Sequence, residues 1–399
     1  MARSKDHAGS GSLNMFQFVS AARRQPAESR LRRHVRKRDP ISVAIAASMV
    51  ALFGLASNAK AQCEYQTLRA SDRKNLGSSV ALSNGVAIIG SSNQDCLDGT
   101  GPYCGAAYVF RFNGNEWLEE QKIISSNLYE YGTSYVYGVA ISGSIAAIST
   151  ASEDSGCEST FSCRAVYIYR HNDYEWVEEI RLMRSGQESF GRAVSVGGNT
   201  LVAGGRTGVY VYRYDGAGWI EAQSISAPVS SSGFGADLVI DGDRILIGAL
   251  NEACTDGPAC GAAYVYRFDG SVWSEEERLM ADQPQALSQF GLAVSIYGDI
   301  AVIGAPGEDC IAGAWCGAAY VFRYTSSGWV QEQRLTTSEP AAFDLYGVAV
   351  AASNDSIVVG SQYAQAYAGI AYVYRFDGMQ WIRSKRLAAR GESLLTDVV

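Results

Sequence analysis

Short apolar segments recur along residues 76–388 of the 399-residue chain, and turns rich in Gly, Asp and Asn separate them. Within a segment such as Tyr264–Phe268, bulky apolar side chains alternate with other residues. This period of two is that of a β-strand, and no helical periodicity competes with it. The Gly-Asp, Asn-Gly and Asp-Gly turns are typical of antiparallel hairpins. The pattern therefore predicts an all-β chain.

The predicted strands form a repeat of four. Repeats start near residues 76, 137, 190, 234, 290 and 346, and a partial repeat starts at 391. One glycine and one tryptophan mark each complete copy: Gly77 and Trp117, Gly138 and Trp176, Gly191 and Trp219, Gly235 and Trp273, Gly291 and Trp329, Gly347 and Trp381. A four-stranded sheet with two apolar faces buries them only against similar sheets. We therefore expect a β-propeller of four-stranded antiparallel blades.

The two ends of the repeat region suggest a further blade. Gln66-Thr67-Leu68 matches the end of a fourth strand, as in Gln333-Arg334-Leu335, and Gly391–Leu394 resembles the start of a first strand. The prediction is six complete repeats plus an incomplete seventh blade built from both termini. Strands two and three of that blade are missing, so an unclosed ring, a six-bladed ring and a truncated chain remain open alternatives.

Residues 1–61 differ in composition from the repeats. Residues 1–40 carry ten Lys or Arg, and 41–59 form an uncharged apolar h-region before Ala59-Lys60-Ala61. This order predicts a basic n-region and a signal peptide cleaved before Gln62, which leaves a propeller over 62–399. The basic preface is long, so Met15 is an alternative start, and an uncleaved membrane anchor is the competing interpretation.

Cysteine spacing supports export. Eight of the nine cysteines form close pairs at one place in the repeat: Cys96 and Cys104, Cys157 and Cys163, Cys254 and Cys260, Cys310 and Cys316. Zinc sites would need shorter C-x-x-C spacings or His partners, so the pairs predict four local disulfides formed in an oxidising compartment. Cys63 is left over, and its context is a poor lipoprotein signal. We expect a secreted, periplasmic or cell-surface protein.

The charge of the repeats excludes some partners. The whole chain has a formal charge of −8, but from Gln62 onward 22 basic residues face 38 acidic ones, a balance of −16. Nucleic acid and anionic membranes bind through clustered Lys and Arg. We therefore expect no nucleic-acid partner and no stable membrane insertion after signal cleavage.

Over roughly residues 64–399 the chain resembles the FG-GAP repeat family, which includes the integrin α-subunit propeller and many secreted bacterial proteins. Phe290-Gly291 with Gly304-Ala305-Pro306 is the full match to the motif, and Phe190-Gly191 and Phe234-Gly235 keep its first half. The resemblance implies a propeller and, in the family, calcium loops between the first two strands. Here those connections are tight turns such as Asp241-Gly242-Asp243, which cannot surround a calcium ion. We expect no metal and no cofactor.

Catalytic groups are scarce. After Gln62 the one histidine is His171, at a strand-end position that other copies fill with an aromatic residue, and no Ser/His/Asp or Cys/His set is available. The acidic pairs Glu119/Glu120, Glu178/Glu179 and Glu275/Glu276 repeat from copy to copy. Neighbouring strand residues point to opposite faces, so we expect these glutamates to pair with the recurring strand-three arginines instead of forming an acid and base. These arginines are Arg111, Arg170, Arg213, Arg267, Arg323 and Arg375. The sequence predicts no enzyme.

The loops between strands two and three vary most and carry the cysteines. On a propeller they share one rim with the connections between blades, and variable loops on rigid blades favour recognition. Candidate rim residues are Asp98, Tyr103, Glu153, Asp154, Asp256, Glu308, Asp309 and Trp315. The alternative is that the disulfides only brace long loops.

These features favour an exported, non-catalytic module for protein or glycan binding and adhesion. One alternative is a propeller lectin with repeated sugar sites, which would need an aromatic residue and a carboxylate at one recurring loop position; Trp315 does not recur. The other is a glycan hydrolase or lyase that uses Asp and Glu.

Overall fold

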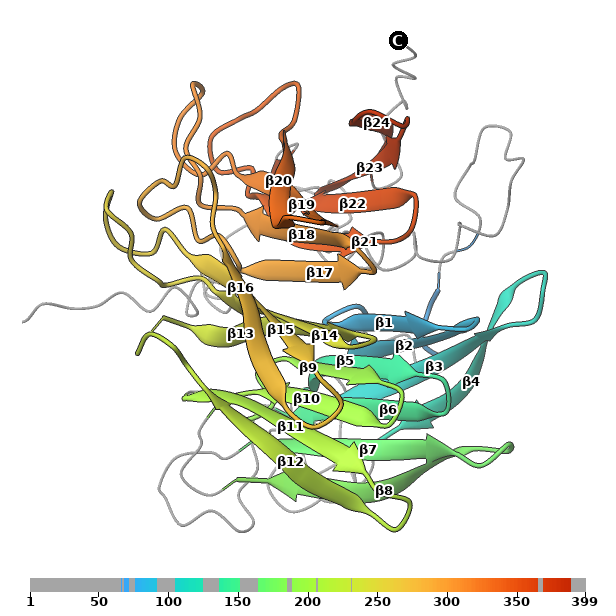
Figure 1. The fold of residues 1–399 in the computed structure, drawn as a ribbon. Coiled ribbons are helices and arrows are strands. Elements are labelled where there is room, and N and C mark those ends of the chain that lie inside the picture. The colour runs from blue at the N-terminus through green and yellow to red at the C-terminus, as the bar shows by residue number, and fades with distance from the viewer. Residues whose placement is uncertain are drawn as a thin grey trace, which may run out of the picture. The chain divides into compact units, whose positions relative to one another are not determined.

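The structure is a computed structural model that describes residues 66, 68–71, 76–91, 105–124, 136–150, 164–184, 189–205, 207–230, 232–364 and 369–388. These residues form six four-stranded antiparallel sheets in a propeller ring, with the strands of each sheet in chain order (Figure 1). The predicted fold class is confirmed. The signal segment, Cys63 and the partial repeat from 391 lie outside the described residues.

The strands are as follows. Blade 1 has β1 (Val80–Ser83), β2 (Val86–Ser91), β3 (Ala106–Phe112) and β4 (Trp117–Ile123). Blade 2 has β5 (Val136–Ser142), β6 (Ile145–Thr150), β7 (Ala165–His171) and β8 (Trp176–Met183). Blade 3 has β9 (Val194–Gly197), β10 (Thr200–Gly204), β11 (Gly208–Tyr214) and β12 (Trp219–Ser226). Blade 4 has β13 (Phe234–Asp241), β14 (Arg244–Ala249), β15 (Ala262–Phe268) and β16 (Trp273–Leu279). Blade 5 has β17 (Ala293–Tyr297), β18 (Ile300–Ala305), β19 (Ala318–Thr325) and β20 (Gly328–Leu335). Blade 6 has β21 (Tyr346–Ala352), β22 (Ser356–Ser361), β23 (Ile370–Phe376) and β24 (Trp381–Ala388).

Apolar contact between neighbouring blades forms the core. Buried side chains of consecutive blades gather into shared clusters, one at each junction from blade 1/2 to blade 5/6. At junction 4/5, for example, Leu246 and Val265 of blade 4 pack with Val294 and Ile303 of blade 5. Each of blades 2 to 5 thus buries both faces against its neighbours, as the two-sided apolar pattern predicts.

The FG-GAP residues explain how closely the blades approach. Phe290 is fully buried against Tyr320 and Phe322 of its own blade, with ring centroids 5.4 and 6.1 Å away. A Cβ placed on Gly304 would lie 1.9 Å from the carbonyl oxygen of Gly347 in the next blade. The glycine of one blade's GAP position therefore contacts the glycine of the next blade's FG position, and no side chain fits between them.

Inner strands also hydrogen-bond to one another through side chains. Ser195 Oγ accepts from Ile240 N (3.1 Å), Asp237 Oδ2 from Val294 N (2.8 Å), and Ser295 Oγ from Ala352 N (3.0 Å). Burial raises the pKa of Asp237 to about 6. Each bond satisfies a backbone N–H that would otherwise lack a partner in a strand beside the axis.

Every outer strand contains a β-bulge against its third strand. In blade 4, Tyr266 pairs with Glu275 and Val265 with Glu277, so Glu276 is the extra residue. The alternation expected for neighbouring strand residues is therefore wrong at Glu276 and Glu277, which both accept from Trp329 of the next blade, because a bulge shifts the side-chain sequence by one. The predicted pairing with strand-three arginines is present in this blade, since Arg267 Nη1 donates to Glu276 Oε1 (3.3 Å).

The bulged glutamates also join blades. Their carboxylates accept the indole N–H of the next blade's tryptophan, at 3.2 Å for Trp176 on Glu120 and 3.0 Å for Trp381 on Glu332. One residue later in the outer strand, Gln333 exchanges two hydrogen bonds with the backbone of Trp381, at 3.0 and 2.7 Å. The outer contacts are therefore specific and directional, unlike the apolar core.

Gln66 makes the same contact on blade 1. Its amide donates to Trp117 O (2.8 Å) and accepts from Trp117 N (2.7 Å), and Leu68 is buried against blade 1. This is the place that the outer strand of a preceding blade takes at the other junctions, as the alignment with Gln333 predicts. The described residues form six sheets and no seventh, and no apolar cluster among them joins blade 6 to blade 1.

Candidate functional site

The loops between strands two and three of blades 4 and 5 are closed by disulfides. Cys254–Cys260 and Cys310–Cys316 each span six residues, with Cα atoms 5.8 Å apart. These two predicted pairs are confirmed; the pairs Cys96/Cys104 and Cys157/Cys163 lie outside the described residues. Each loop continues directly into the third strand of its blade.

Each disulfide loop is bonded to the segment that leads into the next blade. In blade 5, Ala314 O, Trp315 O and Cys316 O accept from the backbone N–H groups of Phe343 (2.9 Å), Leu345 (3.1 Å) and Tyr346 (3.0 Å). In blade 4, Pro258, Ala259 and Cys260 make the equivalent three bonds to Leu287, Gln289 and Phe290. Disulfide and hydrogen bonds together fix the rim at junctions 4/5 and 5/6.

This geometry forces several non-glycine residues into left-handed backbone conformations. At junction 5/6, φ is +60° at Trp315, +66° at Phe343 and +52° at Leu345. Such angles cost a bulky residue about 1–2 kcal/mol each. The equivalent residues at junction 4/5, Ala259, Leu287 and Gln289, have φ of +52°, +64° and +56°. The strain is thus a property of the shared backbone.

The side chains differ between the junctions. At 5/6 the rings of Trp315 and Phe343 face each other with centroids 6.4 Å apart and planes 48° apart. Phe343 is 59% exposed and Trp315 is partly exposed, whereas the other six tryptophans are at most 8% exposed. A partly exposed aromatic pair on a strained, fixed backbone is a candidate recognition feature.

Asp309 lies beside the backbone of Trp315. Its Oδ1 accepts from Trp315 N (3.0 Å), and its own N–H donates to Gln285 Oε1 (3.2 Å). Asp309 is exposed, and its Oδ2 accepts no hydrogen bond from the described residues. The carboxylate therefore orients the Trp315 backbone and keeps one oxygen available.

The residue before Asp309 has a different role. Glu308 is 2% exposed and accepts from Tyr320 Oη (2.6 Å) and from Arg334 Nε (2.8 Å). Glu252 repeats this arrangement in blade 4 with Tyr264 (2.7 Å) and Arg278 (2.8 Å). Burial and the adjacent carboxylate raise the pKa of Tyr264 to about 12. Each of these buried glutamates therefore connects its loop to strands three and four of the same blade.

The other rim residues are separate. Asp256 is exposed in the blade 4 loop, and its contacts are to the neighbouring Thr255 and Cys254. Asp98, Tyr103, Glu153 and Asp154 lie outside the described residues. Among the predicted rim residues, the structure therefore brings together Asp309 and Trp315. Phe343, their aromatic neighbour, was missed, because it is 28 residues away in sequence and belongs to no recurring motif.

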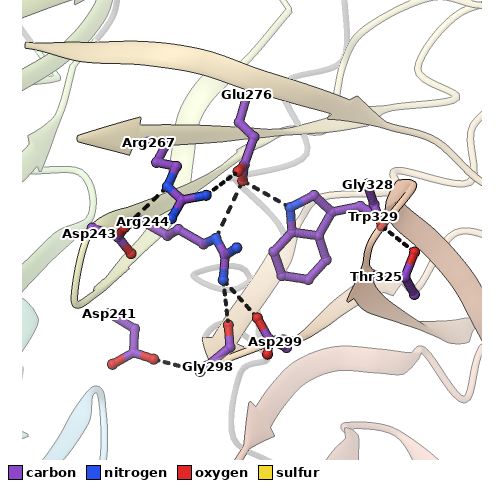
Figure 2. A network of polar contacts seen from close by, with 10 residues as sticks. All are labelled: Asp241, Asp243, Arg244, Arg267, Glu276, Gly298, Asp299, Thr325, Gly328 and Trp329. Atoms are coloured by element: carbon purple, nitrogen blue, oxygen red, sulfur yellow. Dashed lines mark hydrogen bonds and ion pairs between the residues drawn. The ribbon is translucent and has the colours of Figure 1, made fainter. Parts of the chain in front are cut away.

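A second polar cluster lies at the opposite ends of these strands, at junction 4/5 (Figure 2). Glu276 lies between two arginines and an indole: it accepts from Arg267 (3.3 Å) and Trp329 (3.1 Å) and pairs with Arg244 Nε at 3.3 Å. Arg267 also donates to Asp243 Oδ2 (3.1 Å). The charged groups in this cluster bind one another, so it is a joint between blades and not an open site.

Arg244 is the residue of this cluster that sequence analysis missed. It is 8% exposed, bonds Asp299 Oδ1 (3.0 Å), and stacks its guanidinium over the Tyr324 ring at 4.1 Å. It stands opposite Arg267 across β14 and β15, where the other blades place Val86, Ile145, Thr200, Ile300 or Ser356. Its departure from the repeat was the available signal.

His171 takes the place of an aromatic residue, as the repeat predicts. Its ring lies 5.2 Å from that of Trp176, and in blade 1 Phe112 lies 5.3 Å from Trp117. Its Nε2 is 3.3 Å from Glu120 Oε1 in the preceding blade. His171 is therefore part of the outer joint between blades.

Within the described ranges, no group of three or more His, Cys, Asp or Glu side chains is placed to hold a metal ion. In the same part of the chain, no helix has the length and apolar character needed to cross a bilayer.

Comparison with known proteins identifies the repeats. The model of the FG-GAP repeat matches residues 273–322 and 329–374, so the chain carries FG-GAP repeats. Each match starts at the outer-strand tryptophan of one blade and ends in strand three of the next. No curated protein matches the chain in sequence. A solved structure titled "Structure of YjhT" is similar to it with a TM-score of 0.44 and 11% identity, covering 76% of this chain and 96% of the other.

Proposed function

We propose that this FG-GAP propeller is an exported, non-catalytic module that binds a protein or glycan ligand through the rim formed by its strand two to strand three loops. The supporting observation is the contrast between the polar cluster at junction 4/5 and the rim at junction 5/6. The polar groups of Figure 2 are used in mutual contacts, whereas the rim at junction 5/6 holds an exposed aromatic pair and a carboxylate oxygen on a fixed backbone. Preorganised side chains lose little entropy on binding.

Export is supported by the cysteines. Disulfides across short exposed loops persist in oxidising compartments. The basic and apolar segments before Gln62 add a signal for translocation. We therefore place the mature chain outside the cytoplasm, in the periplasm, at the cell surface or in the medium.

We propose that the module is non-catalytic because its buried and outer-strand glutamates are already bound by other side chains. The buried glutamates Glu252 and Glu308 are each held by a tyrosine and an arginine, and the outer glutamates are held by arginine and indole groups. A glycan hydrolase needs two carboxylates that face one substrate bond. At the 5/6 rim, Asp309 Oδ1 accepts from Trp315 N (3.0 Å), and another acid of this rim, Asp344, accepts from Ala341 N through Oδ2 (3.1 Å).

The test uses the purified full-length chain on two arrays, one of glycans and one of purified cell-surface and matrix proteins. The proposal expects binding to at least one class that falls when rim residues are changed and is unaffected by Glu175→Ala, an exposed residue on a hairpin turn away from the rim. Each bound glycan is then incubated with the protein and assayed for new reducing ends. Turnover, or no binding on either array, contradicts the proposal.

A further inference from the structure

The exposed aromatic pair at junction 5/6 is the feature that the fold does not require. Junction 4/5 has the same disulfide loop, the same three backbone hydrogen bonds and the same left-handed residues, with Ala259 and Leu287 at the positions of Trp315 and Phe343. A backbone that closes equally with Ala and Leu does not need Trp and Phe. Trp315 and Phe343 are therefore better explained by a binding role than by the packing of the fold.

The ring geometry suits a flat ligand with an apolar face. Two rings with centroids 6.4 Å apart and planes 48° apart form an open V and not a closed cage. The C–H groups on one face of a pyranose ring pack well on such surfaces, because aromatic faces carry negative charge density and the burial removes apolar area from water.

Asp309 supplies a hydrogen-bond acceptor for the hydroxyl groups of such a ring. Asp309 is exposed, is fixed by its bond to Trp315 N, and has Oδ2 free of hydrogen bonds from the described residues. A carboxylate oxygen at the edge of an aromatic surface accepts hydrogen bonds from sugar hydroxyl groups. The same negative charge, on a chain with 38 acidic and 22 basic residues after Gln62, disfavours uronic or sulfated sugars.

We propose that Trp315, Phe343 and Asp309 form a single subsite for a neutral pyranose ring of a glycan. This rests on the proposed binding function of the rim and names its ligand class. Blade 4 has Ala253, Ala259 and Leu287 at the three positions, so the subsite belongs to one junction and is not a repeated lectin site.

The test follows binding through tryptophan fluorescence, because Trp315 is partly exposed, whereas the other six tryptophans of the chain, all of them described, are at most 8% exposed. The probes are cellohexaose, maltohexaose and chitohexaose as neutral glycans, and hexagalacturonate as the anionic control. We expect a saturable signal change and protection from acrylamide quenching with at least one neutral probe, and no response to hexagalacturonate.

The matched variants exchange residues between the two junctions. Trp315→Ala with Phe343→Leu installs the pair that junction 4/5 already carries, so the variant keeps a native-like backbone, and binding by calorimetry should weaken at least about tenfold. Asp309→Ala should weaken it less. Ala253→Asp, Ala259→Trp and Leu287→Phe together should create a second site of similar affinity.

The variant Ile311→Asn distinguishes a glycan ligand from a protein ligand. Ile311 is fully exposed in the same loop, and an apolar protein interface at this place would use it. The proposal expects unchanged hexasaccharide binding in this variant.

Three results would overturn the inference: no neutral probe binds, binding persists in the Trp315/Phe343 double variant, or the rim ligand is a protein whose binding requires Ile311. In the third case the proposed binding function survives, because a protein still binds at the rim. In the second case it survives only where other rim changes reduce the binding. Turnover of a bound glycan, or no binding on either array, contradicts the proposed function itself.

Discussion

Junctions 4/5 and 5/6 share a backbone and differ in side chains. Both have the disulfide loop bonded to the next blade, a buried glutamate held by tyrosine and arginine, and a glycine in contact with the next blade's glycine. They differ in the rim pair, in the residue that joins the outer strands and in the inner-strand acceptor. The comparison shows that the two junctions keep the same backbone contacts between blades while their side chains diverge.

The largest effect should come from breaking the shared glycine contact. In Gly304→Ala the new Cβ would meet Gly347 O at 1.9 Å, so the blades must separate, and we expect a loss of about 3 kcal/mol in the free energy of unfolding. Gly248→Ala should cost the same, because its Cβ would meet Gly291 O at 1.9 Å. Chemical denaturation measures both.

Gly218→Ala is the control, since nothing lies within 4 Å of its Cβ position and its φ is not left-handed. A loss for Gly218→Ala as large as that for Gly304→Ala would show that the glycine contact does not set blade spacing.

Next in size is the buried glutamate of each loop. Glu308→Ala leaves Tyr320 and Arg334 without their shared acceptor and should cost about 2 kcal/mol, a moderate value because Arg334 is partly solvated. Glu252→Ala should match it. Thermal unfolding checks both, with the exposed Glu175→Ala as a neutral reference. Unequal losses of stability would mean that Glu308 and Glu252 do not stabilise their loops to the same extent.

The pH dependence of stability should distinguish the inner-strand acceptor Asp237 at junction 4/5 from Ser295 at junction 5/6. Burial raises the pKa of Asp237 to about 6, so the folded state holds the proton more tightly than the unfolded chain. Stability from this group is present below about pH 4 and is lost as pH rises through about 6. Relative to Asp237→Ser, the wild type should therefore gain stability as pH falls from 6.5 to 4.

The serine variant is chosen because Ser295 plays this part at junction 5/6, accepting from Ala352 N. Denaturant titrations at several pH values give the comparison, and Ser295→Ala should differ from wild type by an amount independent of pH. A parallel pH profile for Asp237→Ser and wild type would refute the assignment.

The smallest effect concerns the outer strands. At junction 5/6 Gln333 exchanges two hydrogen bonds with the backbone of Trp381, whereas at 4/5 Glu277 makes one, accepting from Trp329 N at 2.8 Å. Gln333→Glu should lose about 1 kcal/mol, since a carboxylate cannot donate to Trp381 O. Glu277→Gln should gain a similar or smaller amount. Equal melting temperatures for both variants and wild type would show that these bonds contribute nothing net.

Much of the architecture follows from local sequence. Strand period and turn residues predicted the four-stranded repeat, and the alignment of Gln66 with Gln333 predicted an outer-strand contact that the structure shows on Trp117. The six-residue spacing of Cys310 and Cys316 predicted their disulfide. Such features involve neighbours in sequence or repeat copies, so they are visible without the fold.

The candidate site was only half visible. Asp309 and Trp315 were identified as loop residues, but Phe343 comes from the next blade and reaches Trp315 through backbone bonds between two loops. Glu308 and Asp309 are adjacent acids, yet one is buried and the other exposed. Glu276 and Glu277 face the same neighbouring blade because of a bulge.

By itself the sequence determined the strands, the blade repeat and the short disulfides, because hydrophobic periodicity, turn chemistry and close cysteine spacing act over a few residues. Only the tertiary structure decided which acid is buried, which arginine lies between blades and which two rings meet at the rim. Those outcomes depend on contacts between blades, where the spacing and register of separate sheets place side chains that local patterns cannot relate.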